Sequence, residues 1–255
     1  MTSPSLRVDL NADMGEAFGP WPMGNDAALL KIVTSANIAC GFHAGDPDVM
    51  ARTMRLAVQN GVGIGAHPGF PDLQGFGRRR MSLGADSLAN AVRYQLGAAQ
   101  AMARAAGGTV RHFKLHGALS NMATEDPELA RICFGVARAV APEIILMVLA
   151  ATGMEAVARD MGGPYAAEIF ADRAYNEDAS LVDRSLPGAV IHDADAAATR
   201  VVAMVRDGAI LTASGARIPT RIDTICLHGD TAEAVAIASA TRAALCDAGI
   251  AVQAL

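Results

Sequence analysis

The sequence has few charged residues and no long basic run. Charged residues make up 18% of its 255 residues, the net charge is −5, and the longest basic run is Arg78-Arg79-Arg80. The chain therefore lacks the positive patch that nucleic-acid binding requires, and we assign these arginines to a solvated loop or to contact with an anion. Hydrophobic residues make up 52% of the chain, enough for a sizeable core, and we expect a single domain over residues 1–255.

The sequence also lacks long apolar runs and paired cysteines. The N-terminal MTSPSLRVDL has no apolar core of a signal peptide, and the longest apolar run, IILMVLAA, is far shorter than a membrane span. The four cysteines are widely spaced, with no CxxC pair that would indicate zinc or redox chemistry. We therefore expect free thiols in a cytoplasmic protein that makes no membrane contact.

Three common catalytic motifs are absent. Neither G-x-x-x-x-G-K-[ST] nor G-x-G-x-x-G occurs, so a nucleotide would be held in an atypical cradle or by another chain. No G-x-S-x-G marks a serine nucleophile. Other residue types must therefore supply the chemistry.

Short apolar runs alternate with amphipathic stretches along most of the chain. This alternation predicts parallel strands joined by crossover helices. The predicted strands cover residues 6–12, 35–40, 62–67, 110–116, 144–150, 167–172 and 224–229. The predicted helices cover residues 47–60, 86–106, 126–140, 153–161 and 193–207, and a last helix runs from a capping box of Asp230 and Glu233 to Gly249. Residues 208–222 break this pattern, and we predict a hairpin there.

Polar side chains follow at least five of the predicted strands. His43, His67, His116 and His228 each follow an apolar run directly. One such histidine is usually structural, but four in the same kind of position indicate a shared site. The carboxyl ends of all barrel strands converge on one mouth, whereas an open sheet concentrates its ligands at a switch point. We therefore predict an α/β fold of the TIM-like (β/α) barrel type rather than an open doubly wound sheet.

The first strand carries several carboxylate and amide side chains. Asp9, Asn11 and Asp13 alternate along it and therefore point to the same side, and Glu16 follows. Carboxylates that meet in this way hold a cation, meet a base or raise one another's pKa. We predict that they lie in the barrel interior or at its mouth.

Two cationic residues lie at other strand ends. Lys114 and His116 are two positions apart and so share a side, and a lysine among apolar residues needs an acid or an anionic substrate as its partner. Arg173 follows Asp172 and precedes a long loop of the kind that forms lids and binding loops. A surface salt bridge is the alternative for Arg173.

Six blocks of the sequence, in order, resemble the LamB/YcsF lactam-utilisation family. They are DLNADMGE, SANIACGFHAGDP, GAHPGFPDLQGFGRR, KLHGALSN, EIFADRAYNEDASLVDRSLPGAVI and ICLHGDTAEAV. The resemblance implies a distorted (β/α) barrel akin to the sugar-deacetylase barrels. It also implies ATP-dependent opening of 5-oxo-L-proline to L-glutamate, carried out together with 5-oxoprolinase subunits B and C.

The polar positions that match the family become the candidate site residues. We predict catalytic roles for Asp13, Glu16, His43, His67, Lys114, His116, Asp172 and His228. We predict substrate contacts for Asp9, Asn11, Asn37, Arg173 and Asp230. Among these, Asp13 or Glu16 is the candidate base, and Lys114 or Arg173 is the candidate anion anchor. The candidate proton donors or oxyanion stabilisers are His43, His67 and His116.

Three positions depart from the family pattern. Leu115 stands where proline is usual, Ser120 where tyrosine is usual and Ala179 where glycine is usual. None of the three removes an ionisable candidate, so we expect them to affect loop shape and substrate fit.

Two other functions are left open by the residues. Asp13, His43 and His67 form a possible divalent-metal set like that of deacetylase barrels, so the chain could be a stand-alone metal-dependent amide hydrolase. Alternatively, it is a lactam-binding subunit whose partners carry the catalytic groups. The sequence also leaves open which subunit holds ATP and whether copies of this chain form a homo-oligomer.

Overall fold

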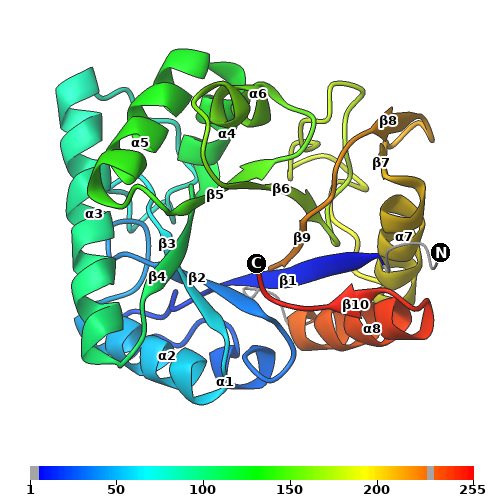
Figure 1. Cartoon of the computed structure of the whole chain (residues 1–255), viewed down its shortest axis with the longest axis horizontal. Coiled ribbons are helices and arrows are strands. Elements are labelled where there is room, and N and C mark those ends of the chain that lie inside the picture. The colour runs from blue at the N-terminus through cyan, green and yellow to red at the C-terminus, as the bar shows by residue number, and fades with distance from the viewer. Residues whose placement is uncertain (1–5, 229–232) are drawn as a thin grey trace.

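The computed structural model, which describes residues 6–228 and 233–255, contains a closed parallel barrel. The strands follow the order β1-β2-β3-β4-β5-β6-β9, and β9 pairs with β1 to complete the ring (Figure 1). They are β1 (Arg7–Met14), β2 (Ser35–Ala39), β3 (Gly63–His67), β4 (Val110–Lys114), β5 (Ile145–Leu149), β6 (Tyr165–Phe170) and β9 (Thr224–Leu227). The predicted TIM-like barrel is thus confirmed.

Helices surround this ring of strands (Figure 1). They are α1 (Asp26–Leu29), α2 (Pro47–Gln59), α3 (Ala85–Ala105), α4 (Gly117–Glu125), α5 (Pro127–Val140), α6 (Gly153–Asp160), α7 (Ala194–Asp207) and α8 (Ala234–Asp247). The start of α2 follows the sequence prediction, because the Asp46 carboxylate accepts hydrogen bonds from the amides of Asp48 and Val49 with Pro47 in the first turn. Of the described helices, none combines the length and apolarity needed to cross a bilayer.

Three small elements lie outside the predicted pattern. Helix α1 is capped by Asn25 but is only 4 residues long, too short for a periodic pattern. Helix α4 begins directly after His116 without a side-chain cap. Strand β10 (Ala251–Val252) pairs only with the first residues of β1. The predicted hairpin is present as antiparallel β7 (Ala209–Leu211) and β8 (Arg217–Pro219). The predicted capping residue Asp230 lies outside the described residues.

Much of the apolar core lies between the strands and the helices. On β1 the alternate residues Val8, Leu10, Ala12 and Met14 are buried in this outer core. The residues between them are polar, and those on neighbouring strands hydrogen-bond to them across the interior. The strands are therefore buried on both faces, as predicted, but they are lined inside by polar side chains that must satisfy one another.

Candidate active site

A cavity of about 620 Å³ opens where the strands end. His67, Lys114, Leu149 and Phe170 are the last residues of four strands, and all of them line it. This volume suits a small-molecule ligand. The other predicted site residues that line the cavity are Asp13, Glu16, His116, Arg173 and His228.

Lys114 lies at the floor of the cavity between two carboxylates. Its Nζ is 2.9 Å from Asp13 Oδ1 and 2.9 Å from Glu168 Oε1, and its side chain is 5% exposed. It also donates a hydrogen bond of 3.0 Å to Cys226 Sγ. The acid partner predicted for this buried lysine is therefore Asp13 of the first strand, together with Glu168 of β6.

The charges of this group follow from burial and pairing. Burial would raise the pKa of Asp13, but His67 and Lys114 outweigh it and hold that pKa well below its usual value. Burial would lower the pKa of Lys114, but Asp13 above all raises it well above its usual value. Burial raises the pKa of Glu168 despite the nearby ammonium. Asp13 and Lys114 are therefore the pair whose charged forms favour each other, and Glu168 is the carboxyl group whose ionisation burial opposes.

A polar network fills the barrel below this cluster. Asn37 donates to Asp13 Oδ1 at 2.8 Å and to Asn11 Oδ1 at 2.7 Å. Asp9 lies deeper, where the hydroxyls of Thr34, Ser35 and Thr224 donate to its carboxylate at 2.5–2.7 Å. None of Asp9, Asn11 and Asn37 lines the cavity, so their predicted substrate contacts stay predictions. Their observed partners indicate that they support the residues above them.

His112 also belongs to this network, although its position within a strand gave no signal in the sequence. Its Nε2 lies 2.8 Å from Asn37 Oδ1, and burial lowers its pKa to about 3. The ring fits only because Gly65 faces it, since a Cβ there would lie 2.0 Å from His112 Nε2. His112 therefore supports the site as a neutral donor.

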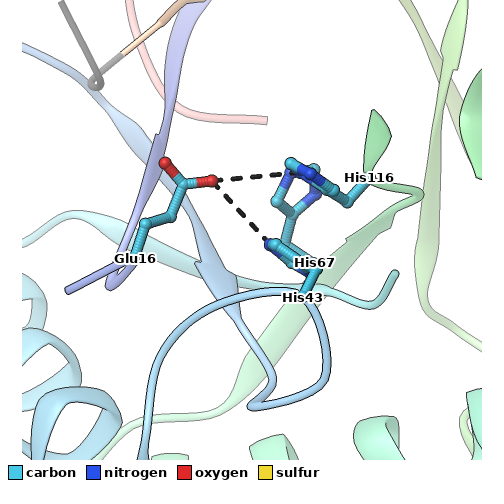
Figure 2. Close-up of side chains that lie close together, drawn as sticks. All are labelled: Glu16, His43, His67 and His116. Carbon is cyan, nitrogen blue, oxygen red and sulfur yellow. Dashed lines mark hydrogen bonds and ion pairs between the residues drawn. The ribbon is translucent and has the colours of Figure 1, made fainter. Parts of the chain in front are cut away.

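Three of the predicted histidines form one cluster with Glu16 (Figure 2). The rings of His43 and His116 stack with centroids 3.6 Å apart, and His67 Nε2 lies 3.0 Å from His116 Nδ1. Glu16 Oε1 lies 3.8 Å from His43 Nε2 and 3.9 Å from His116 Nδ1. Burial, above all, lowers the pKa of His116 to about 3 and that of His43 well below its usual value.

This cluster could hold a divalent metal ion, because one ligand atom from each of Glu16, His43, His67 and His116 lies within 4.8 Å of the others. The predicted metal set also contained His43 and His67, but with Asp13. The structure groups Asp13 instead with Cys226 and His228.

Asp172 and His228 form a second pair at the cavity wall. Both carboxylate oxygens of Asp172 lie 2.8 Å from His228 Nδ1, which must donate to them. His228 Nε2 therefore carries the lone pair, and Arg184 NH2 donates to it at 2.8 Å. Burial would raise the pKa of Asp172, but the interactions with His228 outweigh it and lower that pKa. This arrangement orients the His228 ring toward the cavity, which it lines.

Arg173 anchors the long loop that follows it. It donates to the carbonyls of Val182 and Ala189 at 2.6 and 3.3 Å, and burial lowers its pKa to about 10. The surface salt bridge considered from the sequence is therefore wrong, because Arg173 is buried and its guanidinium donates to carbonyls. Arg78 and Arg80 of the triple-arginine segment also line the cavity.

Several cavity residues were not predicted. Glu168 lies in the middle of an apolar strand, and Arg184 lies in a loop, so no local pattern marks either one. Leu115 and Ser120, two of the departures from the family pattern, also line the cavity. The third, Ala179, has φ 65°, a left-handed conformation that glycine adopts without strain.

The barrel and its cavity define the chain as a TIM-like α/β protein with an ionic cavity at the ends of its strands. Sequence comparison then identifies the family, since the LamB/YcsF family profile matches residues 8–255. The chain belongs to the LamB/YcsF family.

Two relatives illustrate this membership. A protein from Ruegeria pomeroyi, named as the A subunit of 5-oxoprolinase, is 65% identical over 248 residues, covering 97% of this chain and 98% of the relative. The crystal structure of a lactam utilization protein from Thermus thermophilus superposes with a TM-score of 0.92 at 42% identity, covering 98% and 100% of the two chains.

A more distant structure shares only the fold. The family 4 carbohydrate esterase from Streptomyces lividans superposes with a TM-score of 0.52 at 13% identity, covering 96% of this chain and 91% of that one. The predicted likeness to deacetylase barrels is therefore confirmed at the level of architecture.

Proposed function

We propose that this chain is the A subunit of an ATP-dependent 5-oxoprolinase and that its barrel cavity holds the lactam while the ring is opened. The observation that carries the proposal is the 65% identity, over nearly the full length of both chains, to a protein of that name. The cavity of about 620 Å³ with buried charges at its floor supports it. ATP, subunits B and C and 5-oxo-L-proline are the co-substrate, partners and substrate of this proposal, and the cytoplasm is its proposed location.

The chemistry of a lactam explains the proposed use of ATP. An amide carbon is a poor electrophile, and opening this ring near neutral pH is unfavourable. Transfer of a phosphoryl group from ATP to the amide oxygen would give water a carbon that it can attack. Departure of the ring nitrogen would leave an acyl phosphate, which a second water would convert to the carboxylate and phosphate. The site must then supply a base for water, a proton for the leaving nitrogen and cations for the anionic groups.

We assign these tasks from the contacts of each side chain. Lys114, a buried cation at the cavity floor, would stabilise negative charge on the reacting oxygen. His228, oriented by Asp172, would take a proton from water through Nε2 once Arg184 releases that atom, and would return the proton to the ring nitrogen. Asp13 would be a weak base because His67 and Lys114 hold its pKa low, so we favour its role in positioning Lys114.

The test is glutamate release from 5-oxo-L-proline by this chain with subunits B and C, with and without ATP. We expect release only with ATP and the full complex. His228→Gln should reduce turnover by about 10²- to 10⁴-fold, the usual contribution of a general acid or base. His192→Gln is the matched control, since His192 is 68% exposed.

Other outcomes would select the other functions. Glutamate release by the isolated chain without ATP would indicate a stand-alone amide hydrolase. Near-normal turnover of His228→Gln and Lys114→Met complexes, with lactam binding by the isolated chain retained, would indicate a non-catalytic binding subunit.

A further inference from the structure

The hydrogen bonds of two histidines determine which of their nitrogen atoms face each other. His67 Nδ1 lies 2.8 Å from the carbonyl oxygen of Lys114, and His116 Nε2 lies 2.8 Å from that of Phe76. A carbonyl only accepts, so both nitrogens carry hydrogen. In neutral rings His67 Nε2 and His116 Nδ1 therefore carry lone pairs, yet they lie 3.0 Å apart. Two lone pairs at this distance need a cation between them.

Two carboxylates bring further electron pairs close to these nitrogens. Asp13 Oδ2 lies 3.4 Å from His67 Nε2, and Glu16 Oε1 lies 3.9 Å from His116 Nδ1. His43 is 0% exposed, and neither of its ring nitrogens has a hydrogen-bond partner. Its Nε2 is 3.8 Å from the same Glu16 oxygen, so three imidazoles and one carboxylate converge (Figure 2).

We propose that Glu16, His43, His67 and His116 bind one divalent cation of the zinc type at the edge of the barrel cavity. Imidazole and carboxylate are ligands that zinc takes in proteins. Tetrahedral bonds of about 2.0–2.1 Å separate ligand atoms by roughly 3.4 Å. The observed separations of 3.0, 3.8 and 3.9 Å lie on both sides of that value.

The outer contacts match those of metal-binding histidines. Such residues usually donate their second ring N–H to a carbonyl or carboxylate, which fixes the ring orientation. His67 and His116 do this through the carbonyls of Lys114 and Phe76. Gly77 lets the stacked rings come close, because its φ is 61° and a Cβ there would lie 2.7 Å from His43 Cβ and 2.8 Å from His116 Cδ2.

A proton held between His67 and His116 is the rival state. It would satisfy those two nitrogens and leave His43, buried and without a partner, unexplained. A metal ion engages all four side chains and, on binding, releases any proton held there to solvent. This inference does not rest on the proposed function, because its test measures binding rather than turnover.

The experiment uses the untagged full chain after removal of metals with a chelator. Zn²⁺ is titrated in competition with a chromophoric chelator, Co²⁺ is followed by its visible absorption, and melting temperature is measured with each ion. We expect one ion per chain, a Co²⁺ spectrum of low coordination number and a higher melting temperature with either ion.

Matched variants locate the ion. His116→Gln and the milder Glu16→Gln should each weaken Zn²⁺ affinity by at least roughly 100-fold, because changes in the outer contacts of a metal site already cost about 10- to 100-fold. His192→Gln, at an exposed position, and His228→Gln, in the second group, should keep the wild-type affinity. Circular dichroism checks that each variant is folded.

Two results would overturn the proposal. The first is a metal-free wild-type chain that binds neither Zn²⁺ nor Co²⁺ stoichiometrically, which would favour the shared proton. The second is loss of binding in His228→Gln with retention in folded His116→Gln and Glu16→Gln, which would move the ion to the group of Asp13, Cys226 and His228.

Discussion

Replacement of Lys114 by methionine tests the charge arrangement at the cavity floor. Methionine keeps most of the apolar stem, so the packing change is small. The ammonium lies 2.9 Å from two carboxylates that are 10% and 3% exposed, and its loss leaves Asp13 as an unpaired buried charge. Breaking a buried ion pair in this way costs about 3–5 kcal/mol. For a chain of this length, that corresponds to a fall in melting temperature of roughly 6–20 °C.

Double variants identify the carboxylate that carries the charge. Because the pKa of Asp13 is lowered whereas burial raises that of Glu168, Lys114→Met combined with Asp13→Asn should recover about 1–3 kcal/mol relative to Lys114→Met alone. Lys114→Met combined with Glu168→Gln should recover little of the lost free energy of unfolding. Larger recovery with Glu168→Gln would reverse the charge assignment.

The assay is urea unfolding of the isolated chain, followed by circular dichroism at neutral pH. Lys31→Met is the matched control, since the chain has only these two lysines and Lys31 is exposed. It should change the free energy of unfolding by no more than about 0.5 kcal/mol. A Lys114→Met variant within about 1 kcal/mol of wild type would refute the reasoning.

Three further predictions concern the chain outside this cluster. Ala179→Gly should raise the free energy of unfolding by about 0.5–1 kcal/mol in urea titrations. Alanine at φ 65° is in the left-handed region, and the cost of that conformation exceeds the extra conformational entropy that glycine loses on folding. An unchanged or lower free energy of unfolding would contradict this. A thiol reagent at pH 8 should rapidly modify only the exposed Cys246 of the folded chain, and all four cysteines after unfolding. The other three thiols are protected because burial raises the pKa of Cys40 and Cys133 to about 12 and that of Cys226 well above its usual value. Asp172→Asn should be less stable than wild type at neutral pH, and the difference in free energy of unfolding should narrow as the pH falls below about 4. The pKa of Asp172 in the folded chain is below the usual 3.8, so its charge stabilises the fold above pH 3.8, and this stabilisation is lost as the pH falls through the folded pKa. A difference that stays constant on acidification would show that the Asp172 charge contributes nothing.

Most of the fold could be predicted from the sequence because its signals are local. The chain repeatedly shows apolar runs of strand length, helix-start residues such as Asp46 and glycines that end helices. Six of the eight helices among the described residues agree with these signals. Helices α1 and α4 were missed because one is too short for a periodic pattern and the other lacks a side-chain cap. The pairing of β10 with β1 joins the two ends of the chain and has no local signal.

The sequence by itself determined that several ionisable side chains reach the mouth of the barrel. Parallel strands place their carboxyl ends on one side of the barrel. Closure of the ring therefore brings together Lys114, His67, His116 and His228, which lie at or just after the ends of their strands. The alternation of Asp9, Asn11 and Asp13 likewise determined that they share the interior.

Only the tertiary structure decided how these groups pair. Glu168 meets Lys114 from β6, Arg184 reaches His228 from a loop, and Glu16 rather than Asp13 joins the imidazole cluster. Such choices depend on strand register and loop path, which set the distances between segments far apart in the chain and leave no periodic trace in it. Protonation depends on burial as well, and burial exists only after the barrel has closed.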